Sequence, residues 1–239
     1  MTPNLMLMKY VGFCDILGFS SAVLKDIDAT LVVYREFQNT IRKWPFAERA
    51  PVSVYSDSIM VVGDELPPVL HTIGALNWAA LLHGWLIRGG IAYGRYWEER
   101  EDGNLFVVSD ALVKAVALEK TVKVPAVVVA GDIPLGLEAW VPRFQQGIFK
   151  APLLHFRGLN IVNPFNPYWF KSATIRLMEL LDRHQHHSEK YDWFLSLSEA
   201  VAHDDILIPE EILNRMLELG VLQKVPENTN SVPTGDGAD

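Results

Sequence analysis

The stretch Phe13-Cys14-Asp15-Ile16-Leu17-Gly18-Phe19-Ser20 decides the fold expected for this chain. Apolar, β-branched and aromatic residues from Tyr10 to Ile16 predict a strand, and the glycine that follows ends it. Ser20-Ser21 is suited to cap the helix that the apolar spacing predicts from Ala22 to about Trp44. This order of strand, tight turn and helix places the Asp15 carboxylate at a strand end, beside N–H groups that point out of the helix start.

A second strand-forming segment, residues 51–62, contains the polar island Tyr-Ser-Asp-Ser. Strand alternation sends Ser53, Tyr55 and Asp57 to one face and Ser58 to the other. If this strand neighbours the first, the two aspartates meet. Two carboxylates near N–H donors suit phosphoryl transfer, because Mg²⁺ and Mn²⁺ prefer oxygen ligands and offset the charge of a triphosphate. Either aspartate alone is more often a strand-end residue with local hydrogen bonds, so the prediction depends on the pair.

The chain up to about residue 165 alternates strands and helices, which predicts an α/β domain. The expected elements are a helix from Val69 to Trp85, a strand from Leu86 to Tyr96, a hairpin turn at residues 101–104, a helix from Ser109 or Asp110 to Lys120, and strands within 124–129 and 148–162. Residues 172–222 have a helical pattern, whereas the last residues are rich in Pro, Gly, Asn, Thr and Asp. We therefore expect a domain at residues 1–165, a helical extension at 166–225 and a disordered tail at 226–239.

The charge and composition argue against several classes of protein. With 21 Lys and Arg against 29 Asp and Glu, the formal charge of −8 repels the phosphate backbone of a nucleic acid. The single cysteine, Cys14, allows no intrachain disulfide, and the N-terminal residues lack the pattern of a secretion signal, which favours a cytoplasmic protein. Apolar stretches such as Leu76 to Ile87 are interrupted by polar residues and are too short to span a membrane.

Three motifs together resemble the class III nucleotidyl cyclases. The first strand of that family ends in Phe-x-Asp-Ile-x-Gly-Phe-(Ser/Thr), which residues 13–20 match. Residues 56–60 are similar to the hairpin that carries the family's second metal-binding aspartate, and residues 88–94 are similar to its Arg-Val-Gly-Ile-x-x-Gly strand. The resemblance extends from about Tyr10 to Glu119 and implies a ferredoxin-like α+β sandwich that cyclises a nucleotide.

The resemblance also implies a role for each residue of the motifs. Asp15, Asp57 and Ile16 would hold two Mg²⁺ or Mn²⁺ ions. Arg88 would contact the terminal phosphates, together with the turn that is formed by Ile16, Leu17, Gly18, Phe19 and Ser20. The catalytic residues that it implies are Asp15, Asp57 and Arg88.

Two groups of residues depart from the family pattern. Val113 and Ala117 stand where the family has an Asn and an Arg that contact the ribose and the transition-state phosphate. Loss of such a cation can lower phosphoryl-transfer rates by orders of magnitude unless another group replaces it. Ser53 and Phe106 stand where adenylate cyclases have residues that select the base. A small Ser53 beside Tyr55 and Phe106 favours a pyrimidine base, which Tyr55 would help to place.

The combined motifs are similar to those of the pyrimidine cyclases of Pycsar antiphage systems. That resemblance implies conversion of UTP or CTP into cyclic UMP or cyclic CMP by a homodimer with sites at its interface. It also implies activation by phage infection and a separate effector, often membrane-bound, that responds to the product. The alternatives are a cyclase-like domain that binds a nucleotide without turnover, an adenylate or guanylate cyclase, and a nucleotidyltransferase on a related core. The absence of a Gly-Gly-Asp/Glu-Glu-Phe motif counts against the last.

Four other features favour structural roles. The histidines between residues 184 and 187 lack acidic or cysteine partners at zinc-binding spacing, which favours a solvated helix face. Cys14 has no histidine nearby in sequence to activate it and fits a buried core residue. Trp78 and Trp85 share one helix face, which is typical of core or interface packing. The charged residues 98–102 flank a turn glycine, as in a solvated hairpin tip.

Overall fold

The apolar run around Asp15 forms β1 (Leu7–Leu17), an interior strand of the sheet between β3 and β4. The computed structural model describes residues 6–43, 49–140, 143–145, 148–165, 170–183, 188–203 and 207–222. The chain divides into two units, Met1–Leu207 and Ile208–Asp239. Among the described residues, the second unit contains the helix α7 (Glu210–Glu218), and the first unit contains all the other elements.

Four strands of the sheet pair antiparallel in the order β2-β3-β1-β4. Their bounds are β2 (Val52–Tyr55), β3 (Ser58–Gly63) and β4 (Leu86–Glu101). The helices α1 (Phe19–Lys25) and α2 (Ile27–Arg42) lead from β1 to β2, and α3 (Leu66–Leu82) leads from β3 to β4. Each crossover joins two parallel strands that have one strand between them. This is the β-α-β-β-α-β order of a ferredoxin-like fold, so the expected fold class is confirmed.

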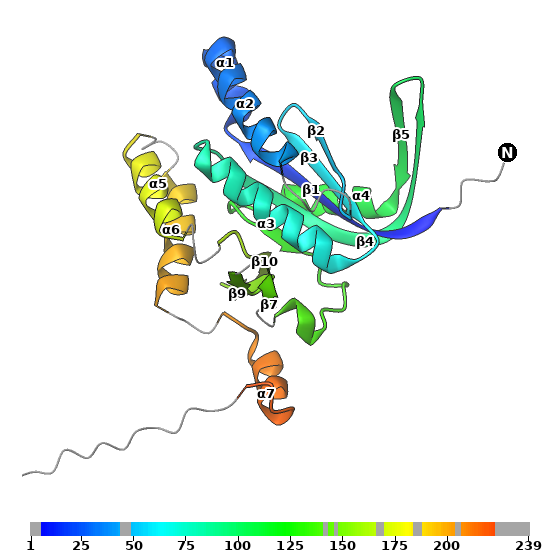
Figure 1. Cartoon of the computed structure of the whole chain (residues 1–239), viewed down its shortest axis with the longest axis vertical. Coiled ribbons are helices and arrows are strands. Elements are labelled where there is room, and N and C mark those ends of the chain that lie inside the picture. The colour runs from blue at the N-terminus through cyan, green and yellow to red at the C-terminus, as the bar shows by residue number, and fades with distance from the viewer. Residues whose placement is uncertain are drawn as a thin grey trace, which may run out of the picture. The chain divides into compact units, whose positions relative to one another are not determined.

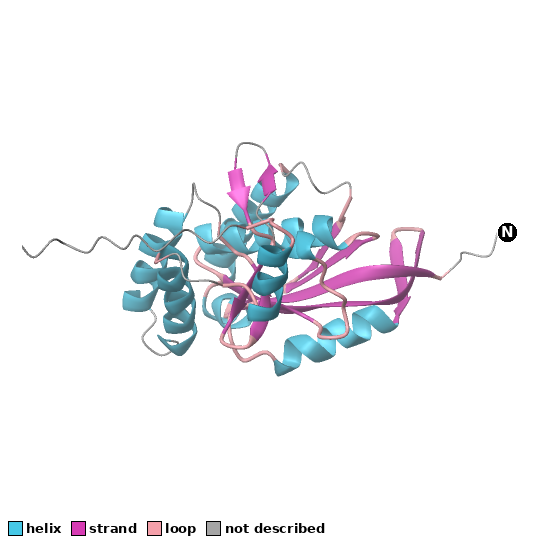
Figure 2. Cartoon of the chain, turned by 90° about the horizontal axis from the view of Figure 1, so that it is seen from below, coloured by secondary structure: helices cyan, strands magenta, loops and turns pink. Residues whose placement is uncertain are grey.

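Helices cover both faces of this sheet (Figure 1 and Figure 2). α3 packs on the face that contains Gly12, where an added Cβ would lie 2.5 Å from the Ile73 side chain. α4 (Asp110–Thr121) packs on the opposite face, where an added Cβ on Gly90 would lie 2.8 Å from the Leu118 side chain. These glycines allow both helices to approach the central strands closely, because a larger residue would collide with the helix.

The sheet extends beyond these four strands along the edge of β4 that lies opposite β1. The distal half of β4 pairs with β5 (Asn104–Ser109) in a long hairpin, visible at the right of Figure 1. The first half of β4 pairs on the same edge in parallel with β6 (Val127–Val129), and β10 and β9 follow in the sheet. The remaining bounds are β9 (Leu153–Phe156), β10 (Leu159–Val162), the short 3₁₀ helix η1 (Leu137–Ala139), and β7 (Arg143–Gln145) with β8 (Ile148–Lys150), which form a separate two-stranded sheet.

α5 (Phe170–Arg183) and α6 (Ser188–Ala202) belong to the first unit. Leu177 and Trp193, on these two helices, are buried in one core cluster together with Leu86 of β4. The segment that the sequence assigns to a helical extension therefore shares a core with the sheet. The domain boundary at residue 165 stays a prediction.

Three details of the first half of the chain differ from expectation. The helix expected from Ala22 onward is interrupted at Asp26, whose side chain accepts a hydrogen bond from the Ala29 amide at 2.9 Å and caps α2. The expected Ser20-Ser21 cap is wrong, because Gly18 is the N-cap of α1. The chain also turns between Tyr55 and Ser58, so these residues pair across the hairpin and share a face, whereas an uninterrupted strand would separate them.

Several other local expectations are confirmed. The turn of the β4–β5 hairpin contains Asp102 and Gly103 at positive φ, 48° and 80°, as a two-residue turn between antiparallel strands requires. The Ser109 hydroxyl caps α4 by accepting a hydrogen bond from the Leu112 amide at 3.0 Å. Cys14 is fully buried, as expected of a core residue. Among the described residues, none of the helices has the length and apolar composition needed to cross a membrane. The histidines at 184–187 and the tail at 226–239 lie outside the described residues.

Candidate functional site

Asp15 and Asp57 lie at the same end of β1. Asp15 pairs across the sheet with Ser58 on β3 and with Arg88 on β4. Asp57 belongs to the turn between β2 and β3, and its carbonyl oxygen accepts a hydrogen bond from the Ile16 amide at 2.9 Å. The Ser20 hydroxyl donates a hydrogen bond of 3.1 Å to the Oδ2 atom of Asp57. The structure therefore brings both aspartates together with Ile16 and Ser20.

The turn from β1 into α1 is held by its glycine and its aromatic residue. Gly18 has a φ of 81°, which an L side chain rarely adopts. Phe19 is buried, and the centre of its ring lies 5.4 Å from the ring of Tyr34 and 5.7 Å from that of Trp85. Because the Ile16 amide is bonded to Asp57, the backbone group that Ile16 can offer a metal ion is its carbonyl oxygen. The phosphate contacts expected of Leu17 through Ser20 stay a prediction.

Negative charge is concentrated around Asp15. Burial raises the pKa of the Asp15 carboxyl, and the negative charges of Asp57 and Glu119 raise it further. The positive charges of Arg88 and Lys190 act in the opposite direction without cancelling these effects. A divalent cation between the carboxylates would relieve their mutual repulsion.

The donors at this place suit a cation that is bound partly by a substrate. The Asp15 side chain is 28% exposed, so its oxygens are accessible from solvent. Mg²⁺ is usually held by one or two protein carboxylates together with phosphate oxygens and water. In the part of the chain that the structure describes, no three His, Cys, Asp or Glu side chains gather in a way that could hold a metal ion. Asp15 and Asp57 therefore fit an ion whose remaining coordination positions are filled by water or phosphate oxygens, and they do not form a complete metal cage.

Arg88 lies between two carboxylates. Its Nε and Nη2 atoms are 2.8 and 2.6 Å from Oε1 of Glu119 on α4, whereas Nη2 is 3.6 Å from Oδ2 of Asp15. The side chains of Arg88 and Glu119 are 25% and 8% exposed. The guanidinium is therefore engaged by Glu119 and stands beside Asp15. Its predicted contact with phosphates stays a prediction.

Glu119 is a residue of this site that the sequence argument missed. The available signal was its position on α4, four residues after the buried Ala115, which places it on the helix face that contacts the sheet. A carboxylate on a buried helix face needs a cationic partner, because an unpaired buried charge is strongly unfavourable. Which strand supplies that partner depends on the packing of α4 against β4.

A cavity of about 720 Å³ opens on the same face of the sheet, toward the other end of β1. Ser53 lines it, as do Met60, Tyr96 and Glu98. The Tyr96 hydroxyl donates a hydrogen bond of 2.8 Å to Glu98. The cavity walls thus combine apolar surface and hydroxyls with the charged side chains of Lys9, Arg49, Asp64, Glu65, Glu98 and Arg100.

The structure separates Phe106 from the other two expected base-binding residues. Tyr55 and Ser53 share a face of the sheet, because they pair with Ser58 and Met60 on β3, whose side chains point to the α4 side. The Tyr55 side chain is 54% exposed. Phe106 pairs with Glu99, so it points to the opposite side of the β4–β5 hairpin from Glu98, and it is 52% exposed. Ser53 and Tyr55 are therefore placed together, and Phe106 lies apart from them within one chain.

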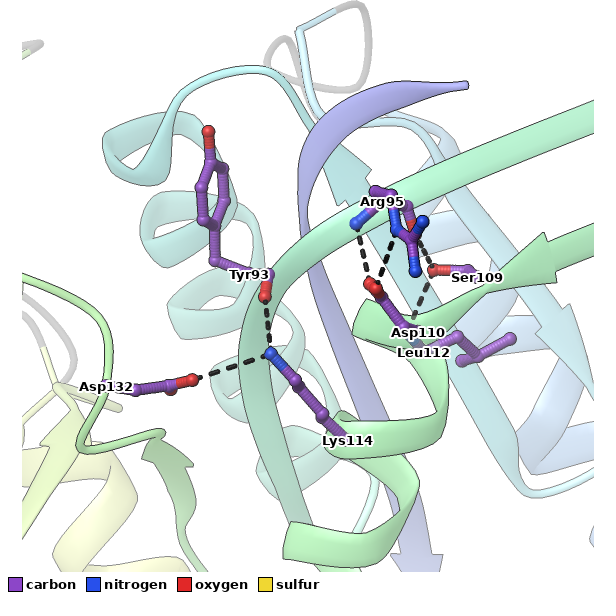
Figure 3. A network of polar contacts seen from close by, with 7 residues as sticks. All are labelled: Tyr93, Arg95, Ser109, Asp110, Leu112, Lys114 and Asp132. Atoms are coloured by element: carbon purple, nitrogen blue, oxygen red, sulfur yellow. Dashed lines mark hydrogen bonds and ion pairs between the residues drawn. The ribbon is translucent and has the colours of Figure 1, made fainter. Parts of the chain in front are cut away.

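The start of α4 is tied to β4 by a polar network (Figure 3). Asp110 accepts hydrogen bonds from the backbone amide and from Nε of Arg95, at 2.6 and 3.1 Å. Lys114 lies 3.5 Å from Asp132 and 3.4 Å from the carbonyl oxygen of Tyr93. These bonds fix the rotation of the helix about its axis. Val113 consequently faces outward and is 68% exposed, and Ala117 is exposed as well.

The sequence matches no protein-family model and no curated protein. Solved structures similar to this chain include the guanylyl cyclase Cya2, with 11% identity and a TM-score of 0.47 over 69% of this chain and 96% of that one. Another is the adenylyl cyclase CyaB from P. aeruginosa, with 13% identity and a TM-score of 0.43 over 54% and 79% of the two chains. A bacterial light-regulated adenylyl cyclase has 13% identity and a TM-score of 0.45 over 74% and 58%. These likenesses concern the fold alone.

Proposed function

We propose that this protein is a nucleotidyl cyclase that converts a pyrimidine nucleoside triphosphate, UTP or CTP, into its 3′,5′-cyclic monophosphate and pyrophosphate. The observation that carries the proposal is the meeting of Asp15 and Asp57, joined through the hydrogen bond from the Ile16 amide to the Asp57 carbonyl. The motif resemblance to class III cyclases, on the same residues, supports it. As in Pycsar systems, the product would be a second messenger for a separate effector in defence against phage.

The proposed reaction is an intramolecular phosphoryl transfer. The substrate 3′-oxygen forms a bond to the α-phosphorus, the bond from that phosphorus to the pyrophosphate oxygen breaks, and the hydroxyl proton is released. Bound Mg²⁺ or Mn²⁺ would supply charge neutralisation and a lowered pKa of the attacking hydroxyl. Asp15, Asp57 and the Ile16 carbonyl oxygen would hold two such ions. The Ser20 hydroxyl keeps the Asp57 carboxylate in place, and Arg88 would contact the terminal phosphates together with the turn from β1 into α1.

The proposed base site is the cavity that Ser53 lines. The small side chain of Ser53 leaves room beside Met60 and Tyr96. The Glu98 carboxylate offers an acceptor for a base N–H group. Tyr55 lies between this cavity and the Asp57 turn along the same hairpin. A ring stacked on Tyr55 would therefore bridge the two regions, and this arrangement supports a role for Tyr55 in placing the base.

We further propose that the active form is a homodimer. In one chain, Val113 and Ala117 on α4 and Phe106 on β5 are exposed at the surface. A second copy of the chain would supply groups to the triphosphate that one chain lacks, including a replacement for the family's arginine. The carboxylates and cavity of one chain and the exposed α4 and β5 residues of its partner would then form one site.

The most direct test incubates the purified protein with each of the four ribonucleoside triphosphates and Mn²⁺. We expect cyclic UMP or cyclic CMP from the wild type and none from Asp57→Ala. No cyclic product from any triphosphate would contradict the proposal. A product from ATP or GTP would keep the cyclase activity and contradict the pyrimidine preference, and a linear or dinucleotide product would favour a nucleotidyltransferase.

The second candidate is a cyclase-like domain that binds a nucleotide and signals without turnover. It is favoured by the apolar side chains of Val113 and Ala117, because neither can stabilise charge on a transition-state phosphate. Metal-dependent binding of UTP or CTP that Asp57→Ala abolishes, without any product, would support this candidate.

A further inference from the structure

The contacts of Arg88 point to a competition between two carboxylates. Arg88 and Asp15 are direct neighbours across β1 and β4, a position from which an arginine normally pairs with an opposite charge. The guanidinium nevertheless points to Glu119, with two contacts of 2.6 and 2.8 Å to one oxygen, and leaves a distance of 3.6 Å to Asp15. Arg88 therefore interacts more strongly with Glu119, on the helix α4, than with Asp15 on the neighbouring strand β1.

The packing of α4 explains why Glu119 reaches Arg88. Gly90, two residues after Arg88, lets the backbone of α4 approach β4, since an added Cβ would lie 2.9 Å from the carbonyl oxygen of Ala115. Glu119 follows Ala115 by one turn of the helix and is itself buried, with a side chain that is 8% exposed. Partial exclusion of water strengthens the pair, so the guanidinium is held firmly on the α4 side.

We propose that Glu119 is a positioning residue that holds Arg88 toward α4 and so keeps the Asp15 carboxylate free for a divalent cation. The inference rests on the proposed function, because it concerns the metal affinity of Asp15 and Asp57. Without the Glu119 charge, the guanidinium closes on Asp15 and competes with the metal ion for the same oxygen. Glu119 touches neither metal nor substrate in this proposal, and it acts through Arg88.

The test measures Mn²⁺ binding to the full-length chain without nucleotide, from the electron paramagnetic resonance signal of free Mn²⁺. In Glu119→Gln, which keeps the size of the side chain and removes its charge, we expect binding to weaken about tenfold. In Arg88→Gln we expect binding as tight as in the wild type or tighter, because the competing cation is gone. In the double variant we expect the Glu119→Gln effect to disappear.

Three outcomes would overturn the inference: unchanged binding in Glu119→Gln, weaker binding in Arg88→Gln, or the same loss from Glu119→Gln in the Arg88→Gln background. The last would mean that Glu119 acts only through its own charge. Glu101→Gln, at the exposed hairpin tip, is the control for losing one negative charge, and circular dichroism checks the fold of each variant. If the wild type showed no Mn²⁺ binding, or if Asp57→Ala did not remove that binding, the result would instead contradict the proposed function itself.

Discussion

The two ends of β1 differ in the balance of positive and negative side chains on the same face of the sheet. At the Leu17 end, Asp15 and Asp57 lie together with Glu119, and the positive charges of Arg88 and Lys190 oppose them. At the Leu7 end, the charges that line the cavity are matched in pairs near the surface, Lys9 with Asp64, Arg49 with Glu65, and Arg100 with Glu98. Surface pairs of this kind contribute little to stability, roughly 0–1 kcal/mol each. The first end has unbalanced negative charge that suits cations, and the second suits a neutral base.

The largest expected effect is a loss of product formation caused by a change at the Leu17 end. Asp57→Asn removes one negative charge from the Leu17 end and keeps the size of the side chain and the backbone bond to Ile16. We expect product formation to fall by roughly a thousandfold, as when a key electrostatic group of a phosphoryl-transfer site is lost. Product assays with Mn²⁺ check this. Activity within a few-fold of the wild type would show that Asp57 does not hold an essential ion.

A second prediction concerns the close approach of α4 that supports the Leu17 end. Gly90→Ala places a Cβ 2.8 Å from Leu118 and 2.9 Å from the Ala115 carbonyl oxygen. We expect a loss of roughly 1–3 kcal/mol in the free energy of unfolding, because α4 must shift outward. Urea titration measures it. Gly131→Ala is the matched control, because an added Cβ there meets no atom within 4 Å, and equal losses in both variants would contradict the prediction.

A third prediction concerns the Leu7 end. Ser53→Trp fills part of the cavity, so we expect KM for the triphosphate to rise about tenfold while Mn²⁺ binding without nucleotide stays unchanged. Val32→Trp, at a 60% exposed position of α2, is the control for added bulk. If Ser53→Trp weakened metal binding as strongly as it raised KM, the two ends could not be treated as separate parts of the site.

The smallest expected effect is on stability and depends on pH. Because burial and the Asp57 charge raise the pKa of Asp15 in the folded state, its ionised form opposes folding at pH 7. Asp15→Asn should therefore melt at a slightly higher temperature than the wild type at pH 7. The difference should shrink as the pH falls through the raised pKa, where the wild-type carboxyl is protonated. Thermal melts across this range check the sign, and a variant that melts lower at pH 7 would contradict it.

The sequence by itself determined the parts of this protein that depend on neighbouring residues. Apolar residues around Asp15 predict a strand, Asp102-Gly103 suits a tight hairpin because both residues adopt positive φ, and Ser109 suits a helix cap because its hydroxyl accepts an N-terminal amide. The pairing of Asp15 with Asp57 was within reach, because adjacent strands in a small α/β domain bring their ends together. These features depend on local geometry that a few residues fix.

Tertiary structure alone decided which distant groups meet. The partners Arg88 and Glu119 are 31 residues apart, and their contact exists because Gly90 lets α4 approach β4. The orientation of Phe106 depended on register, since a shift of one residue along a strand moves a side chain to the other face. Ser58 joined the face of Tyr55 for a similar reason, because a turn replaced two residues of an expected strand. Side-chain direction in a sheet alternates at every residue, so it is fixed only when the strands have found their partners.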